Sequence, residues 1–145
     1  MKAKSLLNKF SSRGFTLIEL LIVIAILGIL AAGILVAINP VQKINQANDA
    51  RAKNGIGQIA TAVQAYYTTN QAYPASIAVL VLSNELKTAP VAPTGYTYSY
   101  SVNGTSTDAQ ASVTLLAPKV SGTPVWCWRS ATGITAEVAT GACVP

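Results

Sequence analysis

Glu19 is an acidic residue inside a long apolar run, and it is the side chain with the clearest chemical demand. From Phe15 to Ile38 the sequence reads FTLIELLIVIAILGILAAGILVAI, interrupted only by Thr16, Glu19 and two glycines. As a helix this run covers about 36 Å, which is enough to cross a bilayer. An ionised carboxylate inside a membrane is costly, so Glu19 indicates a function and a partner of opposite charge.

Cys127 and Cys143 are the two cysteines of the chain, and both lie far beyond the apolar run. If this part is exported, an even number of cysteines in an oxidising compartment favours a disulfide. The closed loop would stabilise the fold by about 3 kcal/mol and hold the C-terminus. Two buried free thiols are the alternative.

The other residue types give little support to catalysis or metal binding. The sequence has no histidine and no glycine-rich phosphate loop. Catalytic acids and bases must be held close to one another and to the reacting atoms of the substrate. The five acidic residues are scattered along the chain, and nothing pairs them in sequence: Glu19, Asp49, Glu85, Asp108 and Glu137. We therefore expect a protein that is not an enzyme and that binds neither a cofactor nor a metal ion.

The positive charge is concentrated in front of the apolar run. Four of the ten cationic side chains precede it, and no acid does: Lys2, Lys4, Lys9 and Arg13. Without residues 1–14, six cations face five acids, so the formal net charge falls from +5 to +1. No specific nucleic-acid surface is therefore expected. The positive-inside rule predicts that residues 1–14 are cytoplasmic and that the bulk of the chain lies beyond the membrane.

A secretory signal peptide and a plain membrane anchor both explain residues 1–38 poorly. The apolar run is longer than the hydrophobic region of a secretory signal, and a plain anchor leaves Glu19 without a role. The residues around Glu19 carry a specific resemblance instead. The segment Arg13-Gly14-Phe15-Thr16-Leu17-Ile18-Glu19 resembles the class III signal of type IV pilins and of the pseudopilins of type II secretion.

This resemblance implies a maturation pathway. In that family a prepilin peptidase in the membrane cuts after the glycine on the cytoplasmic side and N-methylates the new first residue. Gly14 would end the leader, Phe15 would be the methylated N-terminus, and Glu19 would act in assembly. The implied partners are identical or homologous subunits in a helical polymer, the peptidase, and an inner-membrane assembly platform with its ATPase. A single-pass inner-membrane precursor would become part of a periplasmic or extracellular filament.

Cleavage would also supply the partner that Glu19 lacks. The new amine at Phe15 is positive and lies four residues before Glu19, and residues at this spacing share one face of a helix. Glu19 could pair with its own amine or with the amine of an axially displaced neighbour. The resemblance implies the neighbour.

Four segments position these residues. Residues 1–14 are a cleaved leader, and residues 15–39 are the transmembrane half of a long helix. Residues 40–71 are the amphipathic second half of that helix, and residues 72–145 are a globular β-sheet region. Gly28, Gly33 and Pro40 weaken helical hydrogen bonding, so we expect a kink at Pro40. In related filaments this part of the helix can melt on assembly, which predicts melting between Gly28 and Pro40.

The amphipathic half carries a group of charged residues. It comprises Lys43, Asp49, Arg51 and Lys53. We expect these side chains on a solvated face, with salt bridges between subunits as the alternative.

The region beyond residue 72 has the pattern of an antiparallel sheet. A helix at about 75–86, or a buried strand, comes first. From Tyr96 onward the apolar residues recur every second position, which predicts strands near 96–102, 109–116, 125–129 and 134–138. The fold class is therefore α+β, a pilin fold with a long kinked helix packed on three to four strands. The strand aromatics are expected to pack across strands rather than to stack on sugars or bases.

Two members of the family fit the sequence. The major pseudopilin usually has a calcium site in its C-terminal loops, and here only Asp108 and Glu137 lie beyond residue 90. The pair Cys127 and Cys143 instead resembles the disulfide-closed C-terminal region of pilins. We therefore expect a pilin, with a pseudopilin as the alternative. A membrane-anchored binding module, whose helix is only a tether, is the alternative from another class.

Overall fold

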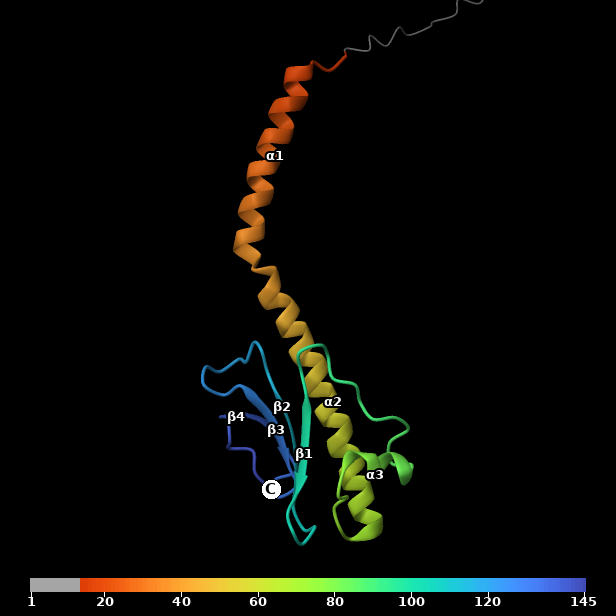
Figure 1. The fold of residues 1–145 in the computed structure, drawn as a ribbon. Helices are drawn as coiled ribbons and strands as arrows, with labels where there is room; N and C mark the ends of the chain where they lie inside the picture. Colours follow the sequence, from red (N-terminus) through yellow and green to blue (C-terminus); the bar gives the residue numbers. More distant parts are fainter. Residues whose placement is uncertain (1–13) are drawn as a thin grey trace, which may run out of the picture. The chain divides into compact units, whose positions relative to one another are not determined.

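The structure is a computed structural model that describes residues 14–145 and divides at Asn39 into two compact units. The N-terminal unit holds one helix, α1 (Leu17–Ile38), drawn in red and orange in Figure 1. The C-terminal unit, Pro40–Pro145, holds two further helices and a sheet. The predicted leader falls outside the described residues, except for Gly14.

Helix α1 carries apolar side chains around its whole circumference. It has 22 residues and none of them is buried. Within the described residues it is the one helix long and apolar enough to cross a membrane. Its length of about 33 Å matches the hydrocarbon thickness of a bilayer.

The helical backbone is interrupted at Asn39, one residue before the proline that predicted a kink. Asn39 has a left-handed backbone with a φ of 46°. A residue before proline is disfavoured in the helical region, and asparagine tolerates the left-handed one. Pro40 then opens α2 (Pro40–Asn70), where its missing N–H has no helical acceptor to lose.

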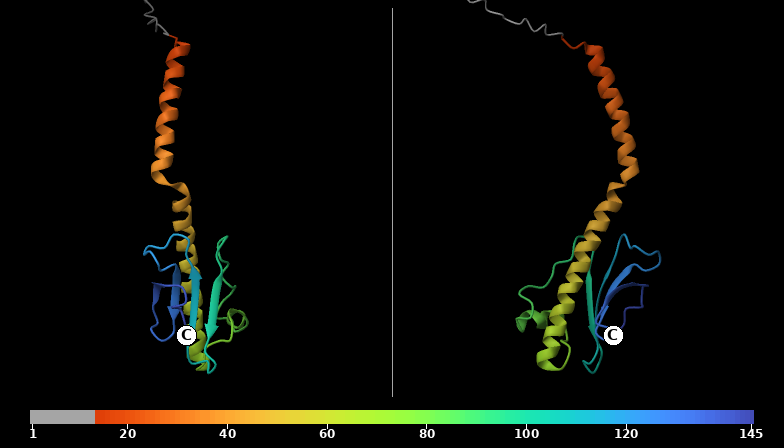
Figure 2. Two further views of the ribbon diagram at one scale, coloured as in Figure 1. Left: turned by 60° about the vertical axis from the view of Figure 1, so that its left-hand side comes forward. Right: turned by 180° about the vertical axis from the view of Figure 1, so that it is seen from behind.

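The sheet has four antiparallel strands in the order β1-β2-β3-β4, each paired with its neighbour in sequence. The strands are β1 (Tyr98–Val102), β2 (Ala109–Thr114), β3 (Val125–Arg129) and β4 (Thr135–Val138). Figure 2 shows α2 running along one face of this sheet. The predicted α+β pilin fold with a small antiparallel sheet is confirmed.

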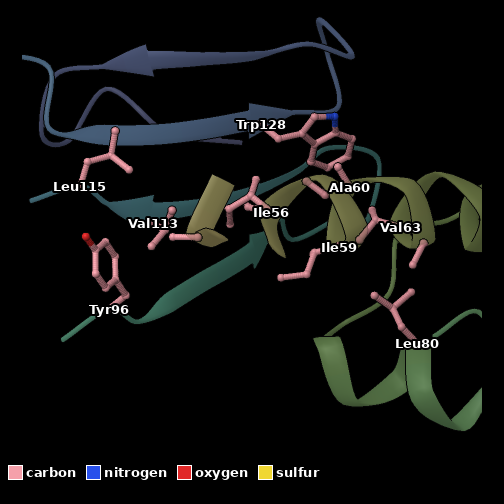
Figure 3. Packing of buried hydrophobic residues seen from close by; sticks show 13 residues of the cluster. Ile56, Ile59, Ala60, Val63, Leu80, Tyr96, Val113, Leu115 and Trp128 are labelled. Carbon is pink, nitrogen blue, oxygen red and sulfur yellow. The ribbon is translucent and has the colours of Figure 1, made fainter. Parts of the chain in front are cut away.

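The core of the C-terminal unit forms where α2 meets the sheet and a short helix. Ile56, Ile59 and Val63 of α2 are fully buried and recur at helical spacing, as the amphipathic pattern requires. Figure 3 shows them between Trp128 of β3 on one side and Leu80 on the other. Leu80 belongs to α3 (Ile77–Leu82). The segment near residues 75–86, for which the sequence allowed either a helix or a buried strand, therefore contains a helix.

Gly55 allows the sheet to approach α2 closely. A Cβ atom at this position would lie 1.9 Å from the hydroxyl oxygen of Tyr98 and 2.4 Å from its ring carbon Cζ. A glycine inside a helix costs about 1 kcal/mol relative to alanine. Here the contact with Tyr98 of β1 explains that cost.

Gly55→Ala is therefore expected to lower the free energy of unfolding by about 1–3 kcal/mol, because the Tyr98 ring must leave its place. Gly57→Ala is the matched control, since a Cβ there meets nothing within 4 Å. The control should raise stability by up to about 1 kcal/mol. Thermal unfolding of the full chain in detergent measures both, and equal effects of the two substitutions would contradict this interpretation.

Candidate functional site

The N-terminal candidate site is built around the first turn of α1. Thr16 is the N-cap residue and has extended backbone angles, with φ −83° and ψ 149°. Gly14 and Phe15 precede it outside the helix and are exposed. The predicted cleavage bond therefore lies in non-helical backbone directly before the helix begins.

Glu19 is held by Thr16 in a reciprocal capping box. Its Oε2 atom accepts hydrogen bonds from the Thr16 amide at 2.9 Å and from the Thr16 hydroxyl at 2.8 Å. The Glu19 amide donates in return to Thr16 Oγ1 at 3.3 Å. Within the described residues, the other carboxylate oxygen of Glu19 accepts no hydrogen bond.

The capping role of Thr16 was not predicted from the sequence. The signal was present, because a threonine three residues before a glutamate is the sequence form of a capping box. The cap also corrects one argument. In the uncut chain Phe15 lies before the cap, so it does not share a helical face with Glu19. A pair between Glu19 and the neighbour's amine does not depend on that shared face.

Gly28 and Gly33 lie inside α1, which is continuous from Leu17 to Ile38 in this single chain. Neither glycine breaks the helix here. The expected melting concerns the assembled filament, so it remains a prediction. The cationic leader residues, Lys2, Lys4, Lys9 and Arg13, lie outside the described residues.

A second group of polar residues fixes the connection between β2 and β3, which we call the β2–β3 loop (residues 115–124). Asp49 of α2 is 4% exposed, although it is charged. Its carboxylate accepts hydrogen bonds from the amides of Leu116 and Ala117, both at 2.9 Å, and from the hydroxyl of Tyr96 at 2.6 Å. Burial, followed by the hydrogen bond to Asp49, raises the pKa of Tyr96 to about 12.

Glu137 of β4 holds the same loop two residues further on. One carboxylate oxygen accepts from the amides of Lys119 at 3.1 Å and Val120 at 3.3 Å. The other forms an ion pair of 2.6 Å with Lys53 of α2, whose ammonium also lies 4.4 Å from the ring centroid of Trp126. The hydrogen bond from Lys53 is the largest cause of a lowered pKa at Glu137.

These contacts correct the expectation of a solvated charged face on α2. Asp49 is buried and Lys53 is paired, whereas Lys43 and Arg51 are exposed. The side chains of Asp49 and Lys53 have partners inside the unit. The β2–β3 loop returns close to α2, where its backbone amides donate to Asp49, and Glu137 pairs with Lys53. Spacing along the helix could not reveal a partner more than sixty residues away.

The predicted disulfide is present. Cys127 of β3 is bonded to Cys143, with their Cα atoms 5.8 Å apart. The bond attaches the C-terminal segment to the sheet. No group of three or more potential metal-ligating side chains occurs within residues 14–145, and the Glu137 carboxylate is already occupied by N–H donors.

Two comparisons with known proteins bear on this arrangement. Residues 9–35 match the family described as the prokaryotic N-terminal methylation motif. The chain is also similar to the type II secretion system core protein G of Pseudomonas aeruginosa, with 38% identity over 108 residues. That alignment covers 63% of this chain and 75% of the relative.

The lowered pKa of Glu137 predicts an acid-sensitive contribution to stability. A depressed folded pKa stabilises the unit above the unfolded value of 4.5, and this contribution is lost as the pH falls through the folded value. Glu137→Gln should therefore flatten the loss of thermal stability below about pH 4.5. Glu85→Gln is the control, since Glu85 accepts no hydrogen bond within the described residues. An unchanged acid profile in Glu137→Gln would contradict this role.

Proposed function

The chain belongs to the family of type IV pilins and type II secretion pseudopilins, and we propose that it is a pseudopilin, a structural subunit rather than an enzyme. One observation carries the proposal: a capped glutamate, Glu19, follows an exposed Gly14–Phe15 bond at the start of an apolar helix. The similarity to a protein named for type II secretion supports the pseudopilin over the surface pilin that the cysteine pair suggested.

The precursor is a single-pass membrane protein anchored by α1. We propose that its N-terminus is cytoplasmic, since four cations precede the helix and no acid does. The C-terminal unit then lies on the periplasmic side, where the disulfide between Cys127 and Cys143 is stable.

In the proposed maturation, a prepilin peptidase cuts the Gly14–Phe15 bond and methylates the new amine. An extended segment fits a protease site better than a helix does, because its backbone amides and carbonyls are free to pair with the enzyme. The Thr16 cap supports this step, since it makes the helix begin at Leu17, after the bond, and leaves Gly14 and Phe15 outside the helix. Cleavage removes residues 1–14 and leaves a positive charge on Phe15.

Assembly then pairs that amine with Glu19 of a neighbouring subunit. Glu19 Oε2 is occupied by Thr16, and the other carboxylate oxygen is available to an incoming amine. In the low-dielectric interior of a helical bundle, a pair of opposite charges is strong and an unpaired charge is costly. The pair therefore sets the axial register of the polymer. The further partners are the inner-membrane platform with its ATPase, and no cofactor takes part.

The first test is the mass of the mature N-terminus. A subunit purified from the native membrane should begin with N-methylated Phe15. A tethered binding module would keep residues 1–14, so an intact N-terminus in the mature protein would overturn the proposal.

Glu19→Ala is expected to insert and to be cleaved, yet to be lost from filaments, because the incoming amine has no carboxylate to meet. Leu20→Ala is the matched control, since Leu20 lies in the same turn and is also exposed. Filament yield is measured in the sheared or pelleted fraction. A normal yield from Glu19→Ala would contradict the role of this carboxylate.

Electron microscopy separates the two kinds of subunit. Expression with a type II secretion assembly system should give short periplasmic fibres at native levels. Long surface fibres that depend on a pilus assembly system would support the pilin interpretation instead.

A further inference from the structure

The β2–β3 loop presents apolar side chains to solvent although its backbone is firmly held. Leu116 is 53% exposed and Val120 is 57% exposed. Four backbone amides of this loop are bound by Asp49 and Glu137, two carboxylates on different elements. A rigid loop with exposed apolar side chains loses little conformational entropy when it binds. These are properties of an interaction surface.

A groove lies on another part of the same unit. It has a volume of about 680 Å³ and runs between α2 and the segment after α3. Glu85 and Leu86 line one side of it. Small and polar residues of α2 line the other side, among them Asn54, Gly57, Thr61 and Ala65. In Figures 1 and 2 the β2–β3 loop, in light blue, lies on one side of α2 and α3 lies on the other.

Gly57 lines this groove, and no contact within residues 14–145 explains why the position is a glycine. A Cβ at Gly55 would collide with Tyr98, whereas a Cβ at Gly57 meets nothing within 4 Å. Glycine in a helix interior lowers helix stability whether or not a contact requires it. A close approach by another chain would account for Gly57 as Tyr98 accounts for Gly55.

The charges of the two surfaces are complementary. Glu85 forms no hydrogen bond or ion pair within residues 14–145. Each of the other four acids accepts at least one hydrogen bond: Glu19, Asp49, Asp108 and Glu137. The ammonium group of Lys119, at the exposed part of the loop, is likewise without a partner in the described chain. An unpaired acid therefore lies in the groove, and an unpaired cation lies on the loop.

We propose that the β2–β3 loop of one subunit docks in the α2 groove of a second copy, with Lys119 of one paired to Glu85 of the other. Leu116 and Val120 then pack towards Leu86, and the missing side chain at Gly57 gives the loop room. The two surfaces are different parts of one subunit, so the contact is heterologous, and it propagates as an open helical polymer when the rotation between copies does not close into a ring. This inference rests on the proposed function and adds a second contact to the one made by Glu19.

A charge exchange tests the pairing. Lys119→Glu and Glu85→Lys should each lower filament yield at least about tenfold, because each places like charges in contact at the interface. The double variant should restore the yield. Arg51→Glu is the matched control, since Arg51 is an exposed cation of α2 outside the groove and loop. It should leave the yield unchanged, and all variants should keep a processed N-terminus at Phe15.

Filaments of normal yield from both single variants, or no recovery in the double variant, would overturn the interface while leaving the proposed function intact. A loss in Arg51→Glu as large as in Lys119→Glu would also overturn it, because the effect would then be one of net charge. The absence of filaments from the unaltered, processed chain would instead overturn the proposed function, and the interface with it.

The groove offers a second, independent measurement. Gly57→Leu should leave the thermal stability of the subunit unchanged or raised, because leucine favours the helix and the site is open. It should nevertheless reduce filament yield more than Gly57→Ala does, because it fills the space for the loop. Equal yields from the two variants would contradict docking at this position.

Discussion

The apolar surface of α1 is not covered by any other part of the chain that the structure describes, and the behaviour of the molecule follows from that. None of its residues is buried, and exposed side chains such as Leu17, Ile29 and Val36 occur along its whole length. Such a surface must be removed from water, first by lipid and then, in the proposed filament, by other copies of the same helix. Lipid tails are as apolar as the side chains of a neighbouring helix. Apolar packing alone therefore does not fix the axial position of a subunit. Glu19 introduces the polar interaction that can do so.

The C-terminal unit differs from α1, because its own residues cover its apolar core and bind its buried carboxylate. Its apolar stripe on α2 is covered by the sheet and α3, and two of its carboxylates, those of Asp49 and Glu137, bind the β2–β3 loop. The disulfide holds the C-terminal segment to β3. In the proposed assembly, a unit held together in this way can pass from the membrane to the filament as a rigid body. What it offers a neighbour is then limited to fixed features of its surface.

The elements predicted most successfully from sequence were those with a strong periodic signal. The long apolar run predicted α1, and the alternation from Tyr98 to Val102 predicted the strand that pairs with β2. These patterns are local, so the sequence contains them directly. The paired cysteines, read with an exported location, likewise predicted the bond between Cys127 and Cys143.

The features that were missed depend on contacts between distant segments or on backbone geometry. Asp49 looked like one member of a solvated charged group, because its partners at Leu116 and Ala117 follow only from the path of the loop. Helix propensity alone makes Gly55 a weak point of α2, whereas the close approach of Tyr98 of β1 requires a glycine there. Thr16 is different, because its capping role follows from a local pattern, a threonine three residues before a glutamate.

A reconstruction of the assembled filament by electron cryo-microscopy would test the proposed ion pair between Phe15 and Glu19, because it locates both of its ends at once. If the ion pair sets the axial register, the amine of Phe15 lies within ion-pair distance of Glu19 in an axially displaced neighbour, and residues 1–14 are absent. A filament in which each Glu19 carboxylate meets no amine from another subunit would contradict it.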